Sequence, residues 1–415
     1  MQGRKFIVLG LSALALILTV GATQKDNNKY WLKIKANNKY ERTQIANAGI
    51  AIETSVDGWV YAYGSSNEKS LLEKAGLLDL ALPSSDFFNL LDFPSKDSNF
   101  HNYAELTEAL QNLVRQNPQI AQLYSIGKSH EGREIWAVQI SGQINEASQL
   151  PGIIYMGGHH AREHLSVETP LGYIKYLLES YNQGNERIQA LVNSRDIHII
   201  PAVNPDGLEF DVASGRYQMW RKNRKTNGDG TFGVDLNRNY GFMWGTGGSS
   251  KNTSSDIYMG KSPFSEPETQ AIKNYVETHK NITILLSFHT FSELILYPWG
   301  HKYNGIENLR DQQVHATMAA KMAEWNRYSP QQSSELYIAS GDTTDWSYGT
   351  YKIISFTFEL DPTQSAGGGG GGFYPGDEII PNVIQKNLEP VLYLLEHADN
   401  PYRVLDTRIS PIVPL

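Results

Sequence analysis

Hydrophobic and polar positions between residue 23 and residue 91 form short segments of two different periods. Alternation with a period of two predicts strands, and apolar positions three or four residues apart predict helices. The predicted strands are residues 30–36, 52–54 and 59–63, and the predicted helices are residues 41–48 and 68–77. The turn signal Asp57-Gly58 separates the second strand from the third. This β-α-β-β-α order is typical of a small ferredoxin-like α+β unit, called the N-terminal unit below.

A stretch rich in Pro, Ser and Asp, residues 82–100, is typical of a connector, so we expect a domain boundary near Leu91 and Asp92. Beyond it lies the large domain, in which apolar strand patterns alternate with helical patterns such as residues 167–181. The predicted strands lie within residues 152–158, 197–205, 282–288 and 353–360. This alternation predicts an α/β domain with a mixed, largely parallel central sheet and helices on both faces, whose functional side chains lie at strand ends.

The two ends of the chain carry segments outside these domains. Arg4 and Lys5 precede an apolar run at residues 6–20 and small residues up to Ala22, which is the pattern of a cleaved signal peptide. An uncleaved membrane anchor is the alternative, but the run is shorter than the roughly 20 residues of a spanning helix. We therefore expect an exported protein. Its expected segments are residues 1–22 (signal), 23–91 (N-terminal unit), 92–400 (large domain) and 401–415 (irregular tail).

Composition, charge and glycine content exclude several classes of partner. With 36 Lys and Arg against 44 Asp and Glu, the formal net charge is -8 at pH 7. No basic run interleaved with aromatic residues offers a surface for nucleic acid. The chain has no cysteine, so any metal must be held by His and carboxylate side chains. Two glycine-rich stretches, residues 245–250 and 367–372, lack the Gly-Lys-Ser/Thr of a phosphate loop and are expected to be flexible surface loops.

The segment GGHHAREHLSVETP, residues 157–170, holds two overlapping metal motifs. In His-x-x-Glu, His160 and Glu163 both bind the metal. In His-x-x-Glu-His, the histidines His160 and His164 bind zinc and Glu163 is a base. The apolar strand pattern just before the segment places it in a turn rather than in a helix, which counts against the second motif. A third ligand is expected from a neighbouring strand, where His289 ends ITILLSFH; two His and one Glu make a catalytic zinc site with an open position.

Taken together, these motifs show that residues 92–398 of the chain resemble the zinc carboxypeptidases of the pancreatic carboxypeptidase A/B family, most closely the secreted bacterial members of the carboxypeptidase T type. The resemblance rests on the ordered series HHAREH, NPDGLEFD, MWRKNR, GVDLNRNYG, SFHTFSELILYPWG, LYIASGDTTDWSYG and FTFEL. It implies one catalytic zinc ion on His160, Glu163 and His289, so that Glu163 is a ligand and His164 is a neighbour.

The same resemblance implies the catalytic residues. Glu359, in FTFEL at the end of a buried strand, matches the general base that takes a proton from the attacking water and passes it to the leaving amine. Arg221, in MWRKNR, matches the arginine that stabilises the oxyanion together with zinc. The neighbouring basic residues, interpreted as a solvated basic face, are Arg216, Lys222 and Arg224.

Four further residues match the substrate-binding pattern of the family. Asn237 and Arg238, in DLNRNY, match the pair that binds the terminal carboxylate of the substrate; a planar guanidinium can do so through two parallel hydrogen bonds. This contact implies an exopeptidase. Arg162 is expected to bind substrate or to orient Glu163, and Tyr337 matches the mobile tyrosine that closes over the substrate.

The resemblance also indicates where specificity is set. In the family, a residue in the loop after the tyrosine tunes the side-chain pocket, and alignment on Tyr337 places Thr344 there, with Asp342 two residues before it. The expected apolar walls are Leu296, Leu336, Ala339 and Thr357. Because Asp342 would add a charge for a cation, we expect a broad preference that covers hydrophobic and basic C-terminal residues.

Within this resemblance, the N-terminal unit is expected to be an inhibitory pro-segment that an activating protease removes; an independent binding domain is the alternative. We expect a monomer that acts on peptide and protein C-termini, without nucleic acid or stable membrane association. Some bacterial relatives hold structural calcium, and since the chain has no EF-hand-type run, calcium is left open. The rival functions are an inverzincin endopeptidase, a catalytically dead binding protein and a hydrolase of cell-wall peptides.

Overall fold

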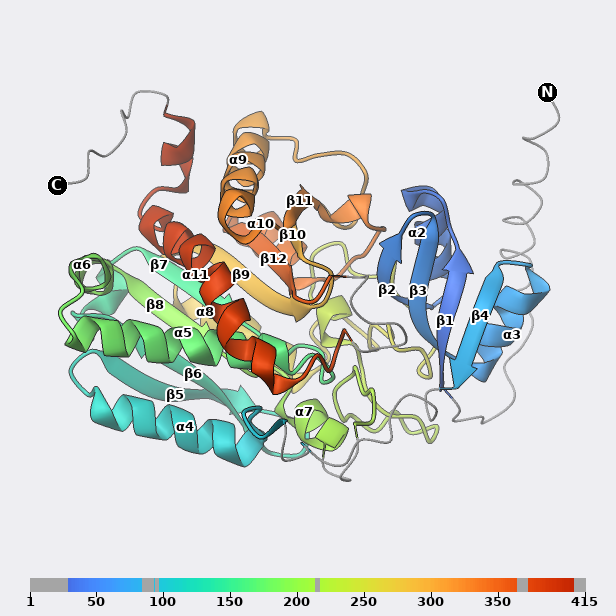
Figure 1. Cartoon of the computed structure of the whole chain (residues 1–415), viewed down its shortest axis with the longest axis horizontal. Helices are drawn as coiled ribbons and strands as arrows, with labels where there is room; N and C mark the ends of the chain where they lie inside the picture. The colour runs from blue at the N-terminus through green and yellow to red at the C-terminus, as the bar shows by residue number, and fades with distance from the viewer. Residues whose placement is uncertain (1–28, 84–92, 94–96, 213–216, 364–371, 407–415) are drawn as a thin grey trace.

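The computed structural model describes residues 29–83, 93, 97–212, 217–363 and 372–406, and it contains two sheets (Figure 1). The N-terminal unit, drawn in blue, has four strands and two helices, and the large domain has an eight-stranded sheet with helices on both sides. The predicted signal peptide, the boundary at Leu91, Arg216, most of the second glycine-rich stretch and the end of the tail lie outside the described residues.

The N-terminal unit has the β-α-β-β-α-β order of a ferredoxin-like fold. Its elements are β1 (Lys29–Lys35), α2 (Lys39–Asn47), β2 (Ala51–Val56), β3 (Trp59–Ser65), α3 (Ser66–Lys74) and β4 (Leu78–Pro83). The sheet order is β2-β3-β1-β4, and neighbouring strands are antiparallel. Strand β4 is an edge strand that pairs only with β1, and it was not predicted, because its last two residues lie in the stretch interpreted as a connector.

Local signals explain how this unit forms. Asp57 and Gly58 have φ values of 49° and 80°, the positive pair that a type I′ turn requires between β2 and β3. Ser65 and Glu68 form a capping box at the start of α3. The unit has a hydrophobic core of its own, made of Leu32, Ile34, Ala36, Ile45, Ala46, Ile50, Ile52, Val60, Ala62 and Leu72. Its core is therefore distinct from the cores on the two faces of the large sheet.

The large domain alternates strands and helices, as the sequence predicted. Its strands are β5 (Ala121–Lys128), β6 (Glu134–Ile140), β7 (Gly152–Met156), β8 (Asp196–Ile200), β9 (Ile282–Thr290), β10 (Leu294–Tyr297), β11 (Ser329–Gln332) and β12 (Ile354–Leu360). Its α-helices are α4 (Tyr103–Gln116), α5 (Leu165–Asn182), α6 (Glu186–Ser194), α7 (Pro205–Val212), α8 (Pro267–Thr278), α9 (Leu309–Asn326), α10 (Thr343–Tyr351) and α11 (Ile380–His397). The 3-10 helices are η3 (Ala147–Gln149), η4 (Leu236–Arg238), η5 (Ser333–Glu335), η7 (Asp377–Ile379) and η8 (Pro401–Leu405).

The strand order of the large sheet is β11-β10-β12-β9-β7-β8-β6-β5. The four central strands, β12, β9, β7 and β8, are parallel, whereas β10 and β6 run antiparallel to their inner neighbours. This confirms the predicted mixed, largely parallel sheet. Because the carboxyl ends of parallel strands meet at one edge, the turn after β7 and the end of β9 lie close together.

Side chains of the central strands point alternately into two cores. Ile153 and Tyr155 of β7 belong to the core that includes α4, α5, α9 and α11, while Ile154 and Met156 belong to the core that includes α8 and α10. Both faces of these strands are buried, so their sequences are continuous apolar runs.

Two predictions about irregular segments were wrong. Residues 245–250 are not a free surface loop: Gly248 has φ 61°, and a side chain there would collide with the backbone oxygen of Ile338, 1.7 Å from an added Cβ. In the tail, Pro401–Leu405 form η8, where the hydroxyl of Tyr402 donates to Asp311 Oδ1 at 2.8 Å. Within the described part of the chain, no helix combines the length and apolar character needed to cross a membrane.

Candidate metal centre and active site

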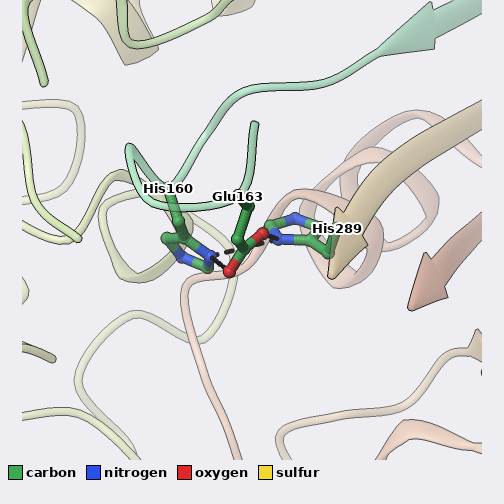
Figure 2. Close-up of side chains that lie close together, drawn as sticks. All are labelled: His160, Glu163 and His289. Atoms are coloured by element: carbon green, nitrogen blue, oxygen red, sulfur yellow. Dashed lines mark hydrogen bonds and ion pairs between the residues drawn. The ribbon is translucent and has the colours of Figure 1, made fainter. Parts of the chain in front are cut away.

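Three metal-binding side chains meet at the carboxyl edge of the central sheet (Figure 2). His160 and Glu163 lie in the turn between β7 and α5, and His289 lies near the end of the neighbouring strand β9. Each residue is at most 3% exposed. His160 Nδ1 is 2.7 Å from Glu163 Oε1, and His289 Nδ1 is 2.9 Å from Glu163 Oε2.

The chemistry of these donors fits a zinc ion. The Nδ1 atoms of His160 and His289 are 3.1 Å apart, so two ring nitrogens face each other as well as the carboxylate of Glu163. Ligand atoms about 2.1 Å from a tetrahedral zinc ion lie about 3.4 Å from one another, close to these separations. Two His and one Glu are a ligand set that holds catalytic zinc with one open position.

The surroundings favour the protonation states that a metal ligand needs. Burial alone would raise the pKa of Glu163, but attraction to His160 and His289 outweighs it and holds the pKa below its ordinary value. Burial lowers the pKa of His289. An ionised carboxylate and a neutral imidazole are the forms that bind zinc.

Asp235, which was not predicted, orients the metal centre. Its Oδ1 lies 3.1 Å from Nε2 of His160, and its Oδ2 accepts hydrogen bonds from Nε and Nη2 of Arg221 at 3.1 and 3.0 Å. A carboxylate on the far nitrogen of a ligating histidine fixes the tautomer and leaves the other nitrogen for the metal. This general rule, applied to the acid two residues before Asn237, could have found Asp235 in the sequence.

The predicted carboxylate-binding pair lies in η4, next to the ligands. Asn237 Nδ2 is 3.3 Å from His289 Nε2, and its Oδ1 accepts hydrogen bonds from the backbone N–H and the hydroxyl of Thr343, both at 2.9 Å. Arg238 donates to the backbone oxygens of Gly248 and Asn237 at 2.9 and 2.7 Å. Thr343 at the start of α10 therefore holds the side chain of Asn237 beside the metal centre, and two backbone oxygens hold that of Arg238.

Strand register brings Glu359 to the metal centre. β12 pairs in parallel with β9, and Glu359 is the partner of His289 in this ladder. Burial raises the pKa of Glu359 well above its ordinary value and repulsion from Glu163 adds to this effect, whereas Arg221 and Arg238 oppose it. Glu359 therefore holds a proton more readily than a free glutamate, which suits a group that transfers protons near neutral pH.

His164 lies apart from the ligand cluster. Its Nε2 is 2.9 Å from Asp211 Oδ2, and its ring contacts Phe93, Tyr217 and Tyr374. The turn thus points His160 and His164 to different partners. This arrangement favours the motif in which Glu163 is a ligand over the motif in which it is a base.

Among the residues that the structure describes, two further clusters of acidic and histidine side chains lie outside this site. Their members are His130, Glu266 and Glu268, and Asp97, Asp377 and Glu378. In the first, Lys225 Nζ is 2.7 Å from Glu266, so a cation of the protein already pairs with one of its two carboxylates. In the second, the backbone and side-chain amides of Asn99 donate to Asp377 at 2.8 and 2.9 Å. We assign neither cluster to calcium.

Lys222 and Arg224 do not form the predicted solvated basic face. Lys222 is 4% exposed, donates to the backbone oxygen of Thr253 at 2.7 Å, and has a pKa that burial lowers to about 8. The guanidinium of Arg224 lies 3.6 Å from the ring centre of Phe210. The prediction failed because both side chains pack against segments distant in sequence.

Three of the predicted specificity residues are linked through β12. Leu296 is the partner of Thr357 in the β10–β12 ladder, and the hydroxyls of Thr357 and Thr344 are 2.8 Å apart. Asp342 caps α10: its Oδ1 accepts hydrogen bonds from the backbone N–H groups of Thr344 and Asp345 at 3.0 and 2.9 Å. The acidic position of the expected pocket, Asp342, thus lies at the start of α10, and the less polar positions lie next to it on α10, β12 and β10.

Asp342 keeps one carboxylate oxygen for another partner. Its Oδ2 is buried and has no hydrogen bond within the described part of the chain. Burial, together with repulsion from Asp345, raises the pKa of Asp342 to about 7. A buried carboxylate oxygen without a donor is costly, and a cationic group would satisfy it.

The N-terminal unit contacts the loops of this site through β2 and α2. The hydroxyl of Tyr337 donates to the backbone oxygen of Ile52 at 3.2 Å. The backbone N–H of Gly248, the glycine that packs on Arg238, donates to Asn47 Oδ1 at 2.7 Å. The predicted mobile tyrosine and the carboxylate-binding loop are thus both held by the N-terminal unit.

Glu53 of β2 was not predicted as part of the site. Its side chain is 3% exposed, forms an ion pair with Arg162 Nη2, and lies 3.9 Å from Arg221 Nη1. Arg162 is fully buried. The arginine expected to bind substrate therefore binds a carboxylate of the N-terminal unit.

A buried mononuclear zinc site with an adjacent carboxyl group and arginines, at the carboxyl edge of an α/β sheet, defines a zinc-dependent hydrolase. Comparison with known proteins narrows this class. The family model of zinc carboxypeptidases matches residues 106–390. A zinc carboxypeptidase from Saccharothrix mutabilis subsp. capreolus is 35% identical over 419 residues, covering 95% of this chain and 95% of the relative. Carboxypeptidase A1 from Homo sapiens is 33% identical over 326 residues, covering 77% of this chain and 73% of the relative.

The fold agrees with these sequence matches. The crystal structure of the carboxypeptidase A from Helicoverpa armigera matches with a TM-score of 0.73 at 22% identity, covering 93% of this chain and 100% of that chain. The chain belongs to the zinc carboxypeptidase family. It is a zinc metallocarboxypeptidase, a hydrolase of peptide C-termini with one catalytic zinc ion, as the sequence resemblance indicated.

Proposed function

We propose that this chain is exported as an inactive precursor. Once the N-terminal unit is removed, it hydrolyses the last peptide bond of peptides that end in hydrophobic or basic residues. The observation that carries the proposal is the β9–β12 register, which sets Glu359 beside His289. His160 and Glu163 complete the zinc ligands, and Asn237 stands next to His289.

The residues of the site divide the chemistry between them. Zinc, when bound, polarises the scissile carbonyl and activates the attacking water. Glu359 takes a proton from this water and delivers it to the leaving amine, and its raised pKa suits both transfers. Arg221, held by Asp235, donates hydrogen bonds to the oxyanion in a buried environment, where such bonds are strongest.

Arg238 and Asn237 make the enzyme an exopeptidase in this proposal. They bind the terminal carboxylate, and a guanidinium matches the two oxygens of a carboxylate in one plane. With this end fixed, only the last peptide bond reaches the zinc ion. Tyr337, whose hydroxyl donates to Ile52 in the covered chain, is free to donate to the substrate once the N-terminal unit leaves.

The side-chain pocket accepts two classes of C-terminal residue. Leu296, Thr357 and Thr344 form its less polar wall, which suits Phe or Leu. The buried Oδ2 of Asp342 has no hydrogen bond among the described residues, so it suits the ammonium of Lys or the guanidinium of Arg. Glutamate at the C-terminus is disfavoured because it would meet this carboxylate.

Export and activation both depend on the N-terminal part of the precursor. Residues 1–22 have the pattern of a signal peptide, and removal of the N-terminal unit requires a protease that cuts near Leu91. The contacts of β2 and α2 with Arg162, Tyr337 and Gly248 support an inhibitory role for the unit. We expect the active enzyme to be a monomer.

The test is release of single C-terminal residues by the chain before and after limited proteolysis near Leu91. Peptides ending in Phe, Leu, Lys or Glu are compared with and without a zinc chelator. We expect chelator-sensitive release of Phe, Leu and Lys, release of Glu at least about tenfold slower, and loss of about 100-fold or more when the C-terminus is amidated.

Three outcomes would contradict parts of this proposal. Equal activity of the uncut and cut chains would contradict the precursor role of the N-terminal unit. Efficient cleavage of the amidated peptide would point to an endopeptidase. Absence of any release, with zinc bound, would point to a binding protein or to a cell-wall substrate.

A further inference from the structure

We propose that Thr343, the first residue of α10, is a positioning residue for substrate binding: its hydroxyl holds the side-chain amide of Asn237 in the orientation that presents the N–H groups to the terminal carboxylate of the substrate. This inference rests on the proposed function, because it takes Asn237 as a residue that binds this carboxylate. Thr343 acts through Asn237 rather than on the substrate itself.

Two donors of Thr343 meet one atom of Asn237. The backbone N–H and the hydroxyl of Thr343 both lie 2.9 Å from Asn237 Oδ1. The oxygen and nitrogen ends of an asparagine amide have nearly the same shape, so their hydrogen-bond partners decide which end points where. A backbone N–H can only donate, so the end of the amide that faces it must be the oxygen. Thr343 thereby turns the nitrogen, Nδ2, the other way.

The nitrogen end of this amide lies beside the metal centre. Asn237 Nδ2 is 3.3 Å from His289 Nε2, and Nδ1 of the same ring faces Glu163 at 2.9 Å. A neutral imidazole that offers one nitrogen to a metal carries its proton on the other nitrogen. Nε2 of His289 is then a donor, so it takes no hydrogen bond from Nδ2. Within the described part of the chain Nδ2 has no other hydrogen-bond partner, so its N–H groups are left for an acceptor on the substrate.

The backbone of Asn237 is fixed independently of its side chain. Its N–H donates to Asp235 Oδ1 at 3.0 Å, and the same oxygen lies 3.1 Å from His160 Nε2. The backbone is therefore tied to the carboxylate that orients a metal-centre histidine, and the amide is tied to α10. Loss of the Thr343 hydroxyl would free the amide and leave the backbone in place.

The start of α10 makes the backbone N–H of Thr343 available. The side chain of Asp342 accepts from the N–H groups of Thr344 and Asp345, the second and third of the helix. The first N–H has no partner inside a helix, and here Asn237 accepts it. The N-terminal end of a helix is partly positive, so it draws electron density toward Oδ1 and makes the N–H groups of the same amide stronger donors.

The hydroxyl of Thr343 is confined by other polar groups. Thr343 is fully buried, and its Oγ1 is 3.2 Å from His159 Nε2, which is 2.9 Å from the hydroxyl of Tyr240. These neighbours keep Oγ1 on the side of Asn237. Valine has the shape of threonine but would place a methyl group against Oδ1, so the amide would lose one of its two donors.

The experiment compares two ligands that differ only in the carboxylate. Calorimetry with the zinc-loaded chain, cut near Leu91, gives the Kd of 3-phenylpropanoate and of 3-phenylpropanamide. In T343V we expect the Kd of the acid to rise about three- to tenfold and that of the amide to change less than about twofold. T343S keeps the hydroxyl and should restore the Kd of the acid, and T350V, at an exposed position of the same helix, should change neither Kd. If T343V does not fold, T343A removes the same hydroxyl and takes its place.

Hydrolysis of a peptide that ends in Phe gives a second measurement. An amide that binds the terminal carboxylate does so equally in the ground state and in the transition state. T343V should therefore raise KM about three- to tenfold and leave kcat nearly unchanged. A fall in kcat with an unchanged KM would overturn the positioning role.

A double-mutant cycle separates this inference from the proposed function. N237A should weaken binding of the acid and not of the amide; equal Kd values in the wild type and N237A would overturn the proposed role of Asn237 and the inference with it. In the N237A background T343V should have no further effect, because the hydroxyl has no amide to hold. If N237A weakens the acid but T343V does not, or if T343V weakens acid and amide equally, the inference fails and the proposed function stands. A loss from T343V that persists in N237A would also overturn the inference.

Discussion

Glu359 and His289 are partners in the parallel ladder between β12 and β9, so one set of backbone hydrogen bonds positions the proposed general base beside a residue of the metal centre. Strands hold side chains more precisely than loops do. The neighbouring turn supplies His160 and Glu163 from β7, the strand on the other side of β9. The centre of the sheet therefore positions the metal centre and Glu359, whereas Arg221, Asn237 and Arg238 come from outside the sheet.

Replacing Glu359 with Gln tests its role in proton transfer. We expect E359Q to lower kcat by about 10³-fold, since a positioned base contributes between about 10² and 10⁴. Zinc content, measured by atomic absorption, should stay at one ion per chain, because Glu359 is outside the ligand cluster. A kcat within tenfold of the wild type would show that another group transfers the proton.

The two histidines of the motif should respond differently to substitution. H160A removes a ligand and should lose zinc and lower the melting temperature, because a metal that binds only the folded state stabilises it. H164A should keep zinc, because His164 contacts Asp211 and the aromatic rings around it. H289A serves as the second positive control. Loss of zinc in H164A together with retention in an E163Q variant would favour the motif in which Glu163 is a base.

The pKa of Asp342, raised to about 7, implies a preference that changes with pH. Below this pH the carboxyl group is protonated and cannot pair with a cation; above it the group is ionised. Between pH 6 and pH 8 the ionised fraction rises about tenfold, and we expect kcat/KM for a C-terminal Lys to rise relative to Leu in proportion. The measurement is the ratio of the two kcat/KM values across this range.

The D342N variant is the control for this pH dependence. It should flatten the Lys-to-Leu ratio and leave the Leu substrate nearly unaffected, because the amide keeps the cap on α10 through its oxygen. An equal loss for both substrates would show that Asp342 acts only as a cap.

Neutralising Glu53 should weaken the contact between the N-terminal unit and the active site in the uncut chain. In E53Q, Arg162 loses its ion-pair partner in β2, and removing one member of a buried pair is strongly destabilising. We expect the residual activity of the uncut chain to rise at least about tenfold. A loss of only about 1.4 kcal/mol in the contact changes the ratio of molecules with a displaced N-terminal unit to molecules with a bound one tenfold. The matched control is E73Q, which breaks the exposed pair with Lys69 within α3 and should change nothing. If the residual activity of the uncut E53Q chain does not rise, contacts other than the Glu53–Arg162 pair hold the N-terminal unit on the active site.

The central strands and the zinc motif could be predicted because their signals are local. β7 and β9 are buried on both faces and are therefore continuous apolar runs; His160 comes four residues after β7, and His289 is the next-to-last residue of β9. The edge strand β11 lacks this signal, because it is the polar segment SPQQ. The edge strand β4, LDLALP, is apolar, but its last two residues lie in the stretch that the sequence analysis interprets as a connector.

The residues that escaped prediction act through contacts distant in sequence. Asp235 meets His160 across 75 positions, and Glu53 meets Arg162 across 109. Lys222 shows the opposite error: it lies in a basic cluster that looks solvated, yet its ammonium is buried against Thr253. Burial of such groups depends on how the loops and the N-terminal unit pack, which local patterns do not encode.

The pairing of Glu53 with Arg162 within one chain has a kinetic consequence. Covalent attachment gives the carboxylate an effective concentration on the order of millimolar at the site, so a free peptide must compete with a ligand that cannot diffuse away. A cut in the connector turns this intramolecular contact into an ordinary bimolecular equilibrium. After the cut, the fraction of enzyme that the released N-terminal unit still inhibits depends on the protein concentration. The onset of activity therefore requires dilution as well as cleavage.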